Sequence, residues 1–228
     1  MRIIITGHKG AIGSRLMKQL PTAMGIDTSE GDNLVDCPLP DADVIYHLAA
    51  HPHVEESWDR PVYYMENLVT TVRLVKEYPK ATIIYANSAS AIDPESPYGF
   101  SKKVAGEYLK TFHPYYIGLM FPNVYDTGRS VVDYFKERDT LTVFGEGDAI
   151  RDYVHIDDIV DGLIKAQKWA FGEYQMGGGC IHTVKELAES TGKPITYEAP
   201  RKEAHESVIP NTTPNWKPTI NVTKHLND

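Results

Sequence analysis

Residues 2–13 read RIIITGHKGAIG, in which a short apolar run is followed by three glycines at intervals of three. A continuous apolar run of this kind is typical of a strand buried on both faces of a parallel sheet. Gly7, Gly10 and Gly13 permit a sharp turn and a close approach of backbone N–H groups to an anion, which side chains would obstruct. From Ile12 onward, apolar residues recur at helical spacing. The stretch therefore predicts a strand, a glycine turn and a helix whose N-terminus can bind a pyrophosphate.

An acidic residue, Asp27, follows the next apolar segment, fourteen residues after Gly13. A carboxylate at the end of a second strand accepts hydrogen bonds from both ribose hydroxyls of an adenosine and repels a 2′-phosphate. We therefore predict that the dinucleotide is NAD. Lys9 keeps NADP open as an alternative, because its ammonium group lies inside the glycine turn and could pair with a 2′-phosphate.

Length and composition exclude several classes of protein. With 228 residues, the chain can bury one sizeable core and a small second lobe, and its net charge of −8 argues against nucleic-acid binding. The two cysteines lie in no metal-ligand spacing, so we predict no metal site and a reducing, cytoplasmic location. The first strand starts at residue 2, so we expect no signal peptide, and no apolar run reaches membrane-spanning length.

Strand and helix patterns alternate over the first half of the chain. This alternation predicts an α/β protein with a doubly wound parallel sheet, which is the Rossmann architecture. Residues 28–40 contain glycine and prolines without a helical period, so we expect a loop there in place of a crossover helix. The expected strands cover residues 2–6, 23–26, 43–50, 81–86 and 115–121, and the expected helices cover 12–20, 61–78 and 98–111.

The second half is less regular and predicts a smaller lobe. We place a dinucleotide-binding domain at 1–125 and a substrate-binding lobe at 126–228, with part of 150–180 packing back on the first domain. In doubly wound sheets the ligand binds beyond the carboxyl ends of the strands. Residues 49–53, 87–90 and 122–125 follow such ends, as the glycine turn does. In the lobe we expect helices at 131–138, 157–169 and 183–190, and strands at 141–144 and 174–176.

Tyr98 and Lys102 lie four residues apart and therefore on one face of the expected helix. An ammonium group there, together with a positive nicotinamide ring, would stabilise a phenolate and lower the pKa of the tyrosine. A tyrosine tuned in this way can take the proton of a sugar hydroxyl while hydride leaves the same carbon. Ser88, at the preceding strand end, can hydrogen-bond the same oxygen. The pattern predicts Ser88, Tyr98 and Lys102 as the catalytic residues.

Six motifs occur along the chain in an informative order. They are the glycine turn, HLAAHPHV at 47–54 with Ser57, Pro61 and Asn67, the Ser88/Tyr98/Lys102 set, FPNVY at 121–125, RDYVHIDD at 151–158, and NWKP at 215–218. In this order they resemble the extended short-chain dehydrogenases/reductases, specifically the nucleotide-sugar epimerase/dehydratase family. The resemblance covers nearly the whole chain. Within the family, the chain is most similar to the UDP-glucose/UDP-galactose 4-epimerase type, but it is shorter.

The resemblance implies an NAD-dependent epimerase of a nucleoside-diphosphate sugar, acting by transient oxidation at C4 and return of the hydride. It also implies a homodimer formed by the helices that start near Pro61 and Tyr98. The implied substrate contacts are His53, Ser88, Ser90, Asn123, Arg151 and Arg201. The implied cofactor contacts are Gly7, Lys9, Gly10, Ala11, Ile12, Gly13, Asp27, Asn33, Leu34, Leu48, Ala49, Ala50, Asn67, Tyr98, Lys102, Phe121 and Pro122.

Departures from the family pattern narrow the expected reaction. The family's dehydratases carry an Asp-Glu pair directly after the Ser/Thr of the catalytic set, whereas this chain has Ala89 and Ser90. We therefore do not expect dehydration. Only nine residues separate Ser88 from Tyr98, so the sugar pocket must be small. Two alternatives stay open, namely an NADPH-dependent reductase of a nucleotide keto-sugar and a non-catalytic dinucleotide-binding protein.

Overall fold

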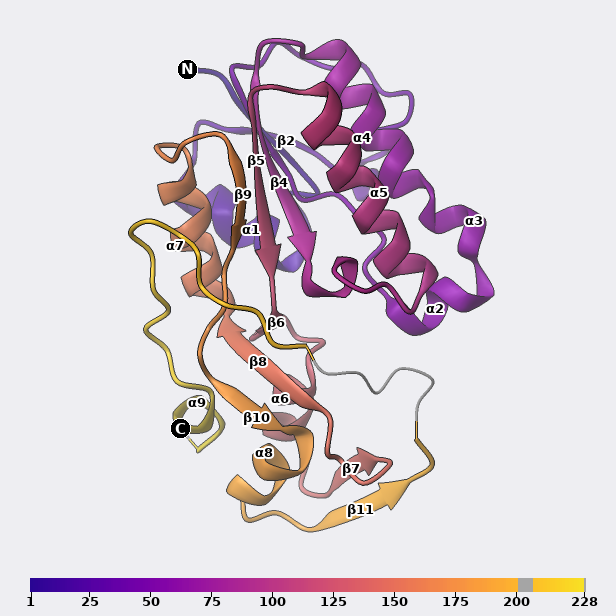
Figure 1. Cartoon of the computed structure of the whole chain (residues 1–228), viewed down its shortest axis with the longest axis vertical. Helices are drawn as coiled ribbons and strands as arrows, with labels where there is room; N and C mark the ends of the chain where they lie inside the picture. Colours follow the sequence, from indigo (N-terminus) through magenta and orange to yellow (C-terminus); the bar gives the residue numbers. More distant parts are fainter. Residues whose placement is uncertain (201–206, 228) are drawn as a thin grey trace. The chain divides into compact units, whose positions relative to one another are not determined.

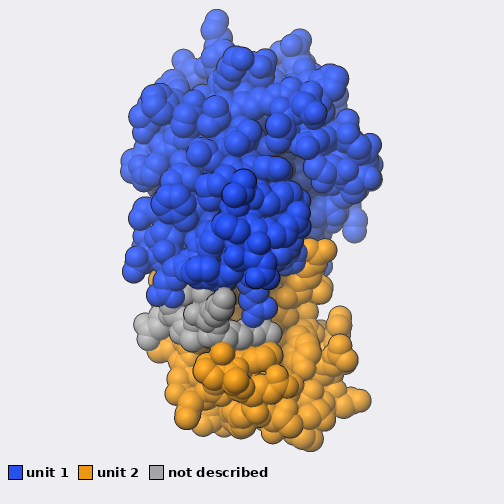
Figure 2. Space-filling view, turned by 90° about the vertical axis from the view of Figure 1, so that its right-hand side faces the viewer, with its two compact units in different colours: residues 1–120, 163–174 blue, residues 121–162, 175–228 orange. Residues whose placement is uncertain are grey.

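The computed structural model describes residues 1–200 and 207–227 (Figure 1). The chain forms two compact units (Figure 2). Unit 1 comprises Met1–Met120 and Leu163–Tyr174, and unit 2 comprises Phe121–Gly162 and Gln175–Asp228. Within the described ranges, no helix combines the length and the apolar character that crossing a membrane would require.

Unit 1 is built on a six-stranded sheet, and its first strand is the expected one. The strand β1 lies between β2 and β3 in this sheet, because β2 pairs with one edge of β1 and β3 pairs with the other edge. The pairs β1–β2, β1–β3 and β3–β4 are all parallel, which confirms the predicted doubly wound Rossmann-like sheet. The strand order is β2-β1-β3-β4-β5-β9, with β1 at Ile3–Thr6, β2 at Met24–Ile26, β3 at Val44–His47, β4 at Thr82–Ser88, β5 at Tyr116–Phe121 and β9 at Gly172–Gln175.

The core of unit 1 follows from the apolar runs of these strands. Ile4, Ile45 and Ile83 occupy one row across β1, β3 and β4, and each is at most 1% exposed. Burying such a side chain stabilises the fold by about 1.5–3 kcal/mol. The connection from β2 to β3 contains only a 3-10 helix, η1 (Thr28–Glu30), so the expected loop replaces a crossover helix. Arg73 fixes this loop by donating hydrogen bonds to two of its carbonyl groups.

The helices of unit 1 differ from the expected ones in one region. The single helix expected at 61–78 is broken at Met65, whose N–H donates to the carbonyl of Val62 in a tight turn. A further short helix, α2, precedes the break and was not expected. In Figure 1, α4 and α5 run side by side. The helices are α1 at Ala11–Gln19, α2 at Val54–Asp59, α3 at Pro61–Tyr64, α4 at Glu66–Glu77 and α5 at Pro97–Phe112.

Unit 2 contains a three-stranded sheet in the order β10-β8-β6 and a two-stranded parallel pair of β7 and β11. Its core gathers Tyr125, Phe135 and Tyr153. The strands are β6 at Asn123–Tyr125, β7 at Leu141–Phe144, β8 at Ile150–His155, β10 at Ile181–Thr183 and β11 at Ile195–Glu198. The helices are α6 at Val131–Glu137, α7 at Ile156–Ala166, which runs into unit 1, α8 at Val184–Ser190 and α9 at Val222–Asn227.

Candidate active site

The glycine turn after β1 is shaped by close backbone approaches. Gly7 has φ +70°, and a Cβ atom there would lie 2.8 Å from the backbone of Ala49, which follows β3. A Cβ at Gly13 would lie 2.2 Å from the carbonyl oxygen of Gly7. The helix α1 then begins after Gly10, which offers no side-chain cap, and its first turn holds no acidic residue. Its N-terminal N–H groups therefore suit an anion, and the turn fits the pyrophosphate of a dinucleotide.

Asp27 directly follows β2, as predicted, and its carboxylate is held in place from two sides. One oxygen accepts hydrogen bonds from the N–H and the hydroxyl of Ser29, at 3.0 and 2.8 Å. The other oxygen accepts from the N–H of Lys9 at 3.0 Å, which connects Asp27 to the glycine turn. Burial raises the pKa of Asp27, but these hydrogen bonds outweigh it and the net pKa is lowered. The carboxylate is therefore ionised at neutral pH, as contact with ribose hydroxyls requires.

The side chain of Lys9 is paired within the protein. Its ammonium nitrogen lies 2.7 Å from one carboxylate oxygen of Glu30, and the other oxygen lies 3.2 Å from Nε2 of His8. The pairing raises the pKa of Lys9 and lowers that of Glu30. Two carboxylates, those of Asp27 and Glu30, thus surround this corner of the turn. The arrangement disfavours the NADPH alternative, because a 2′-phosphate would have to displace Glu30 from Lys9.

The end of β3 is tied to β1 and α4 by a hydrogen-bonded chain. The Thr6 hydroxyl accepts from the N–H of Ala49 at 3.2 Å and contacts Nδ1 of His47 at 2.9 Å. Nε2 of His47 lies 3.0 Å from the Thr71 hydroxyl. Burial, with a contribution from the charge of Lys102, lowers the pKa of His47 to about 3, so the ring stays neutral. This chain positions the predicted cofactor contacts Leu48, Ala49 and Ala50, which are half-buried.

The structure brings together the predicted Ser88 and Tyr98. Ser96 caps α5 by accepting a hydrogen bond from the N–H of Gly99 at 3.1 Å, so Tyr98 lies in the first turn. A Cβ at Gly99 would lie 2.5 Å from the carbonyl oxygen of Ser90. The first turn of α5 is therefore packed against the segment that follows β4. Ser88 ends that strand, and its hydroxyl accepts from the N–H of Ser90 at 3.2 Å.

The electrostatics of this pair without a bound cofactor are set mainly by burial. Burial raises the pKa of Tyr98, and a hydrogen bond with Ser88 offsets only part of that rise, whereas the predicted lowering of the pKa also involves a positive nicotinamide ring. The Lys102 ammonium group is engaged elsewhere. It donates to the carbonyl of Ala86 at 2.6 Å and lies 4.2 Å from the centroid of the Tyr85 ring. Burial also lowers the pKa of Lys102 to about 7, so the charge meant to stabilise a phenolate is itself disfavoured.

Asn67 is a predicted cofactor contact whose polar atoms are engaged inside the protein. Its amide nitrogen donates to the Ser101 hydroxyl at 2.9 Å, and its oxygen accepts from the N–H of His51 at 2.8 Å. Asn67 is only 3% exposed, and it joins α4, α5 and the loop after β3. This geometry supports a role for Asn67 in positioning α4, α5 and the loop after β3 relative to one another.

The remaining predicted contacts in unit 1 vary in accessibility. Leu34 packs its side chain into the hydrophobic core, so only its backbone is available to a ligand. Asn33 is exposed, and its side-chain oxygen accepts from the N–H of Val35. His53 is exposed at the start of α2. Ala11 and Ile12 open α1, where Ala11 is exposed and Ile12 is half-buried.

In unit 2, the structure brings together Asn123 on β6 and Arg151 on β8. A guanidinium nitrogen of Arg151 donates to the Asn123 side-chain oxygen at 3.4 Å, and the Asn123 amide donates to the carbonyl of Asp152 at 3.2 Å. Both side chains are half-buried and offer donors suited to a diphosphate. Phe121 and Pro122, at the end of β5, are buried. Arg201 lies outside the described residues.

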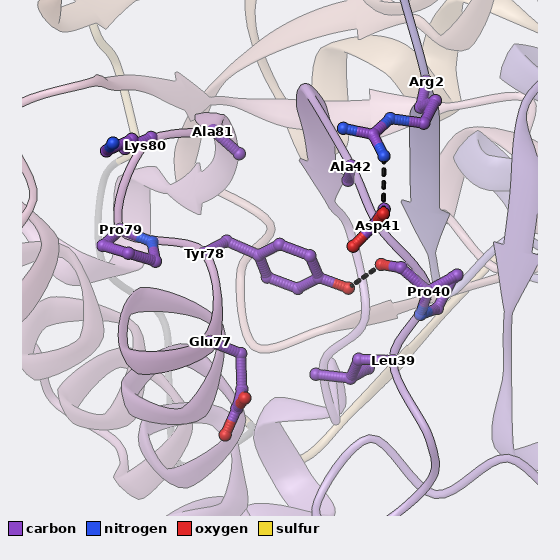
Figure 3. A pocket seen from close by; sticks show the side chains of 10 residues that line it. All are labelled: Arg2, Leu39, Pro40, Asp41, Ala42, Glu77, Tyr78, Pro79, Lys80 and Ala81. Carbon is purple, nitrogen blue, oxygen red and sulfur yellow. Dashed lines mark hydrogen bonds and ion pairs between the residues drawn. The ribbon is translucent and has the colours of Figure 1, made fainter.

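A pocket in unit 1 lies away from all these residues (Figure 3). It is lined by Arg2, Ala42 and Ala81, which come just before β1, β3 and β4. Tyr78 points across it and donates to the carbonyl of Pro40 at 2.6 Å. Because ligands of doubly wound sheets bind at the carboxyl ends of the strands, this pocket is not the candidate active site.

Sequence comparison identifies a family that matches most of the chain. The model described as "NAD dependent epimerase/dehydratase family" matches residues 3–175. The chain is 28% identical over 296 aligned positions to the UDP-glucose 4-epimerase of Mycolicibacterium smegmatis, covering 96% of this chain and 94% of that protein. It is 24% identical to a putative UDP-glucose 4-epimerase of Methanocaldococcus jannaschii, with the same coverage of 96% and 94%.

Structure comparison finds neighbours with the same fold over their whole length. The UDP-glucose 4-epimerase of Thermotoga maritima, solved with UDP-glucose, has a TM-score of 0.84 at 25% identity and covers 100% of this chain and 96% of that one. The Thermus thermophilus UDP-glucose 4-epimerase, solved with NAD, has a TM-score of 0.83 at 23% identity, with coverage of 100% and 97%. This chain and these neighbours therefore share the fold over nearly all of both chains.

Proposed function

The chain belongs to the NAD dependent epimerase/dehydratase family, and on that basis we propose that it epimerises a nucleoside-diphosphate sugar at C4. The family confirms the predicted enzyme class and the predicted cofactor, NAD. When bound, NAD accepts a hydride from the sugar and returns it. The NADPH-dependent reductase and the non-catalytic binding protein are not favoured.

In the proposed reaction, Tyr98 removes the proton of the C4 hydroxyl and later returns it, while Ser88 hydrogen-bonds the same oxygen. The contact that supports these roles is the packing of Gly99 against Ser90, which holds the first turn of α5 beside the end of β4. Lys102 lies about one turn after Tyr98 on α5, and we propose that both side chains bind the ribose of the cofactor. Because the protein alone raises the pKa of Tyr98, the positive nicotinamide ring must supply the missing stabilisation of the phenolate.

Epimerisation is favoured over dehydration by the residues after Ser88. Ala89 and Ser90 form the 3-10 helix η2 (Ala89–Ala91), which Ser88 caps through its hydroxyl. Neither residue carries the acid or the base that expulsion of water from the sugar would need. The chemistry available at this turn is therefore a single proton transfer coupled to hydride transfer.

We propose that unit 2 serves as the predicted substrate lobe and that Asn123 and Arg151 bind the diphosphate of the substrate. Their mutual hydrogen bond on neighbouring strands supports the assignment, because it presents a guanidinium group and an amide together. The predicted roles of His53, Ser90 and Arg201 toward the sugar nucleotide remain proposals of the same kind. UDP is the proposed nucleotide because relatives that cover the chain are named for UDP-sugars.

We propose a homodimer formed by α4 and α5 as well. These neighbouring helices, with α3, leave large apolar side chains exposed, which a partner copy would cover. The exposed fractions are 83% for Val62, 47% for Val69, 50% for Phe100 and 61% for Phe112. A cytoplasmic location is proposed from the two free cysteines, Cys37 and Cys180.

The direct test of the proton-transfer role is Tyr98→Phe, assayed by interconversion of UDP-galactose and UDP-glucose. We expect turnover to fall by at least about 100-fold, as for loss of a general acid–base group, while UDP-sugar binding is retained. Tyr108→Phe is the matched control, because Tyr108 lies on the same helix and packs against Phe112. Undiminished turnover in Tyr98→Phe would refute the assignment.

A further inference from the structure

A cluster in unit 2 brings together the buried His155 and the half-buried Asp126 and His225. They come from three distant segments, namely the residue after β6, the end of β8 and helix α9. One oxygen of Asp126 lies 3.3 Å from Nε2 of His155, and its other oxygen lies 4.0 Å from Nε2 of His225. One ligand atom from each residue falls within 4.8 Å of the other two. Within residues 1–200 and 207–227, no second group of three such side chains is arranged in this way.

The environment of the two histidines leaves one nitrogen unsatisfied. The side chain of His155 is only 5% exposed, and both rings pack against Tyr125, at centroid distances of 5.1 and 5.2 Å. Nε2 of His225 is buried and makes no hydrogen bond to any described residue. A buried ring nitrogen without a partner is unfavourable and calls for an explanation. Its nearest charged neighbour in the cluster is the Asp126 carboxylate.

The backbone at Asp126 is held in an unusual conformation. It has φ 62°, and it is the one residue other than glycine with a positive φ in the described chain. The carboxylate of Asp133 fixes this turn by accepting hydrogen bonds from the N–H groups of Asp126, Thr127, Arg129 and Ser130. Backbone strain that is over-determined in this way is common where a side chain has to be aimed at a ligand.

We propose that Asp126, His155 and His225 form a binding site for a divalent transition-metal ion of the zinc type. Two imidazoles and one carboxylate are ligands that suit zinc, cobalt and nickel. Metal–ligand bonds of about 2.0–2.1 Å place the ligand atoms of a tetrahedron roughly 3.3 Å apart. One oxygen of Asp126 already lies at this distance from His155, whereas His225 lies 4.0 Å from the other oxygen. The ligand atoms are up to 4.8 Å apart, so the His225 ring has to move toward the other two ligands when the metal binds. A water molecule would complete the coordination from the partly exposed side of Asp126.

Binding requires a change of tautomer at His155, which replaces one hydrogen bond with Asp157 by another. In the structure, Nδ1 of His155 accepts a hydrogen bond from the N–H of Asp157 at 3.1 Å, so the proton of the neutral ring lies on Nε2. When the metal takes Nε2, that proton moves to Nδ1. The N–H of Asp157 then loses its acceptor, and the carboxylate of Asp157 has to move closer than its present 3.7 Å to accept the hydrogen bond from Nδ1, as the outer carboxylates of metal-bound histidines do. Asp157 is thus a positioning residue for the site.

The site would link the C-terminal helix to the core of unit 2. Helix α9 has six residues, too few to be stable alone, and it carries His225. A metal bound to Asp126 and His155 would fasten this helix to the ends of β6 and β8. The role is structural and independent of the proposed epimerase reaction. Sequence spacing does not reveal it, because the three ligands share no local motif.

The test is titration of the purified full chain, freed of metal by a chelator, with Co²⁺ and then Zn²⁺. We expect one equivalent of Co²⁺ to bind, with the absorption bands of a four-coordinate ion, and to be displaced by Zn²⁺. Asp126→Asn and His225→Gln should each weaken Co²⁺ binding at least tenfold, and Asp157→Asn by about tenfold. His182→Gln is the matched control, because His182 lies 3.8 Å from Glu186 in the same unit without a third ligand.

Three outcomes would overturn the site. They are a wild-type chain that binds no equivalent of either ion, a His225→Gln variant that binds as tightly as the wild type, and a His182→Gln variant that loses binding equally. If a variant fails to fold by circular dichroism, X-ray absorption of the cobalt-loaded wild type decides. The spectrum must show two imidazole ligands with oxygen, and any other ligand set contradicts the proposal.

Discussion

Lys102 is a buried lysine whose charged form the fold disfavours. Its pKa is lowered to about 7 from an ordinary value of 10.5, chiefly by burial. Between these two values, the unfolded chain holds a proton that the folded chain has released. The free energy of unfolding therefore rises with pH across this window, by at most about 1.4 kcal/mol per pH unit from this group.

Replacing Lys102 with Met should remove this pH dependence. We expect the stability of the wild type relative to Lys102→Met to increase from pH 7 to pH 9, because only the wild type has the titrating group. The measurement is urea unfolding of nucleotide-free protein at several pH values. Lys103→Met, at an exposed neighbouring position, should track the wild type. A difference between the wild type and Lys102→Met that stays constant with pH would show that Lys102 keeps an ordinary pKa.

Glu30 is the residue that sets the charge around Lys9. Because Glu30 pairs with Lys9 at 2.7 Å, Glu30→Gln should free an ammonium group for a 2′-phosphate. We expect NADP binding to improve a few-fold relative to NAD, since exposed ion pairs are weak. The readout is the ratio of the two dissociation constants by calorimetry. Glu173→Gln, which breaks another exposed Lys–Glu pair at 3.0 Å, should leave the ratio unchanged.

If Glu30→Gln leaves the ratio of the NAD and NADP dissociation constants at its wild-type value, Asp27 alone determines the preference for NAD.

The sequence pattern identified Asp27 and Lys9 as cofactor contacts but did not identify Glu30. The reason is local geometry, because Glu30 reaches Lys9 only through the 3-10 turn that Asp27 caps and Gly31 ends in a left-handed conformation. A strand-end carboxylate is recognisable from its position, whereas a partner brought in by a turn is not.

At the scale of elements, the first turn of α5 carries the proposed chemistry. Gly99→Ala would place a Cβ 2.5 Å from the carbonyl oxygen of Ser90 and push this turn away from Ser88. We expect turnover to fall by about tenfold or more, because small displacements of reacting groups are costly. NAD binding at the glycine turn should persist. Steady-state kinetics, with NAD content measured separately, distinguish the two effects.

Lys103→Ala is the control for Gly99→Ala, since it changes an exposed position of the same helix. Full turnover in Gly99→Ala would mean that the contact with Ser90 does not position Tyr98. An equal loss of turnover in Lys103→Ala would instead indicate that any substitution in α5 disturbs the enzyme.

Most strands of unit 1 could be predicted because their signals are local. An apolar run followed by glycine marks β1, and the expected strand at 141–144 coincides with β7 in unit 2. The strands β6, β8, β10 and β11 were missed, since each pairs with a strand distant in sequence and carries no comparable local signal. The break at Met65 was also missed, because the backbone there stays right-handed and no proline or glycine marks it.

Across the whole molecule, alignment to relatives places gaps inside this chain rather than only at its ends. The alignment to the Methanocaldococcus jannaschii relative spans 287 positions, although this chain has only 228 residues. It nevertheless covers 94% of that relative. The short connection between Ser88 and Tyr98 is consistent with gaps of this kind inside the chain.

The proposed homodimer can be tested by placing a charge in its expected interface. Val69→Glu would place a charge among the exposed apolar side chains of α4 and α5, so we expect it to convert a dimer into monomers. Light scattering after size-exclusion chromatography measures the mass directly. Val208→Glu is the control, because Val208 is similarly exposed, at 43%, but lies outside these helices. A wild type that elutes as a monomer at micromolar concentration would exclude this dimer.

The most direct test of the whole account is the fate of the hydrogen at C4. The enzyme is supplied with UDP-galactose deuterated at C4, without added cofactor, and the product is examined by mass spectrometry and NMR. The account predicts UDP-glucose that keeps the deuterium at C4, because the hydride leaves and returns within one active site. Conversion with loss of the label, or conversion only when NADPH is supplied, would contradict transient oxidation by a retained NAD.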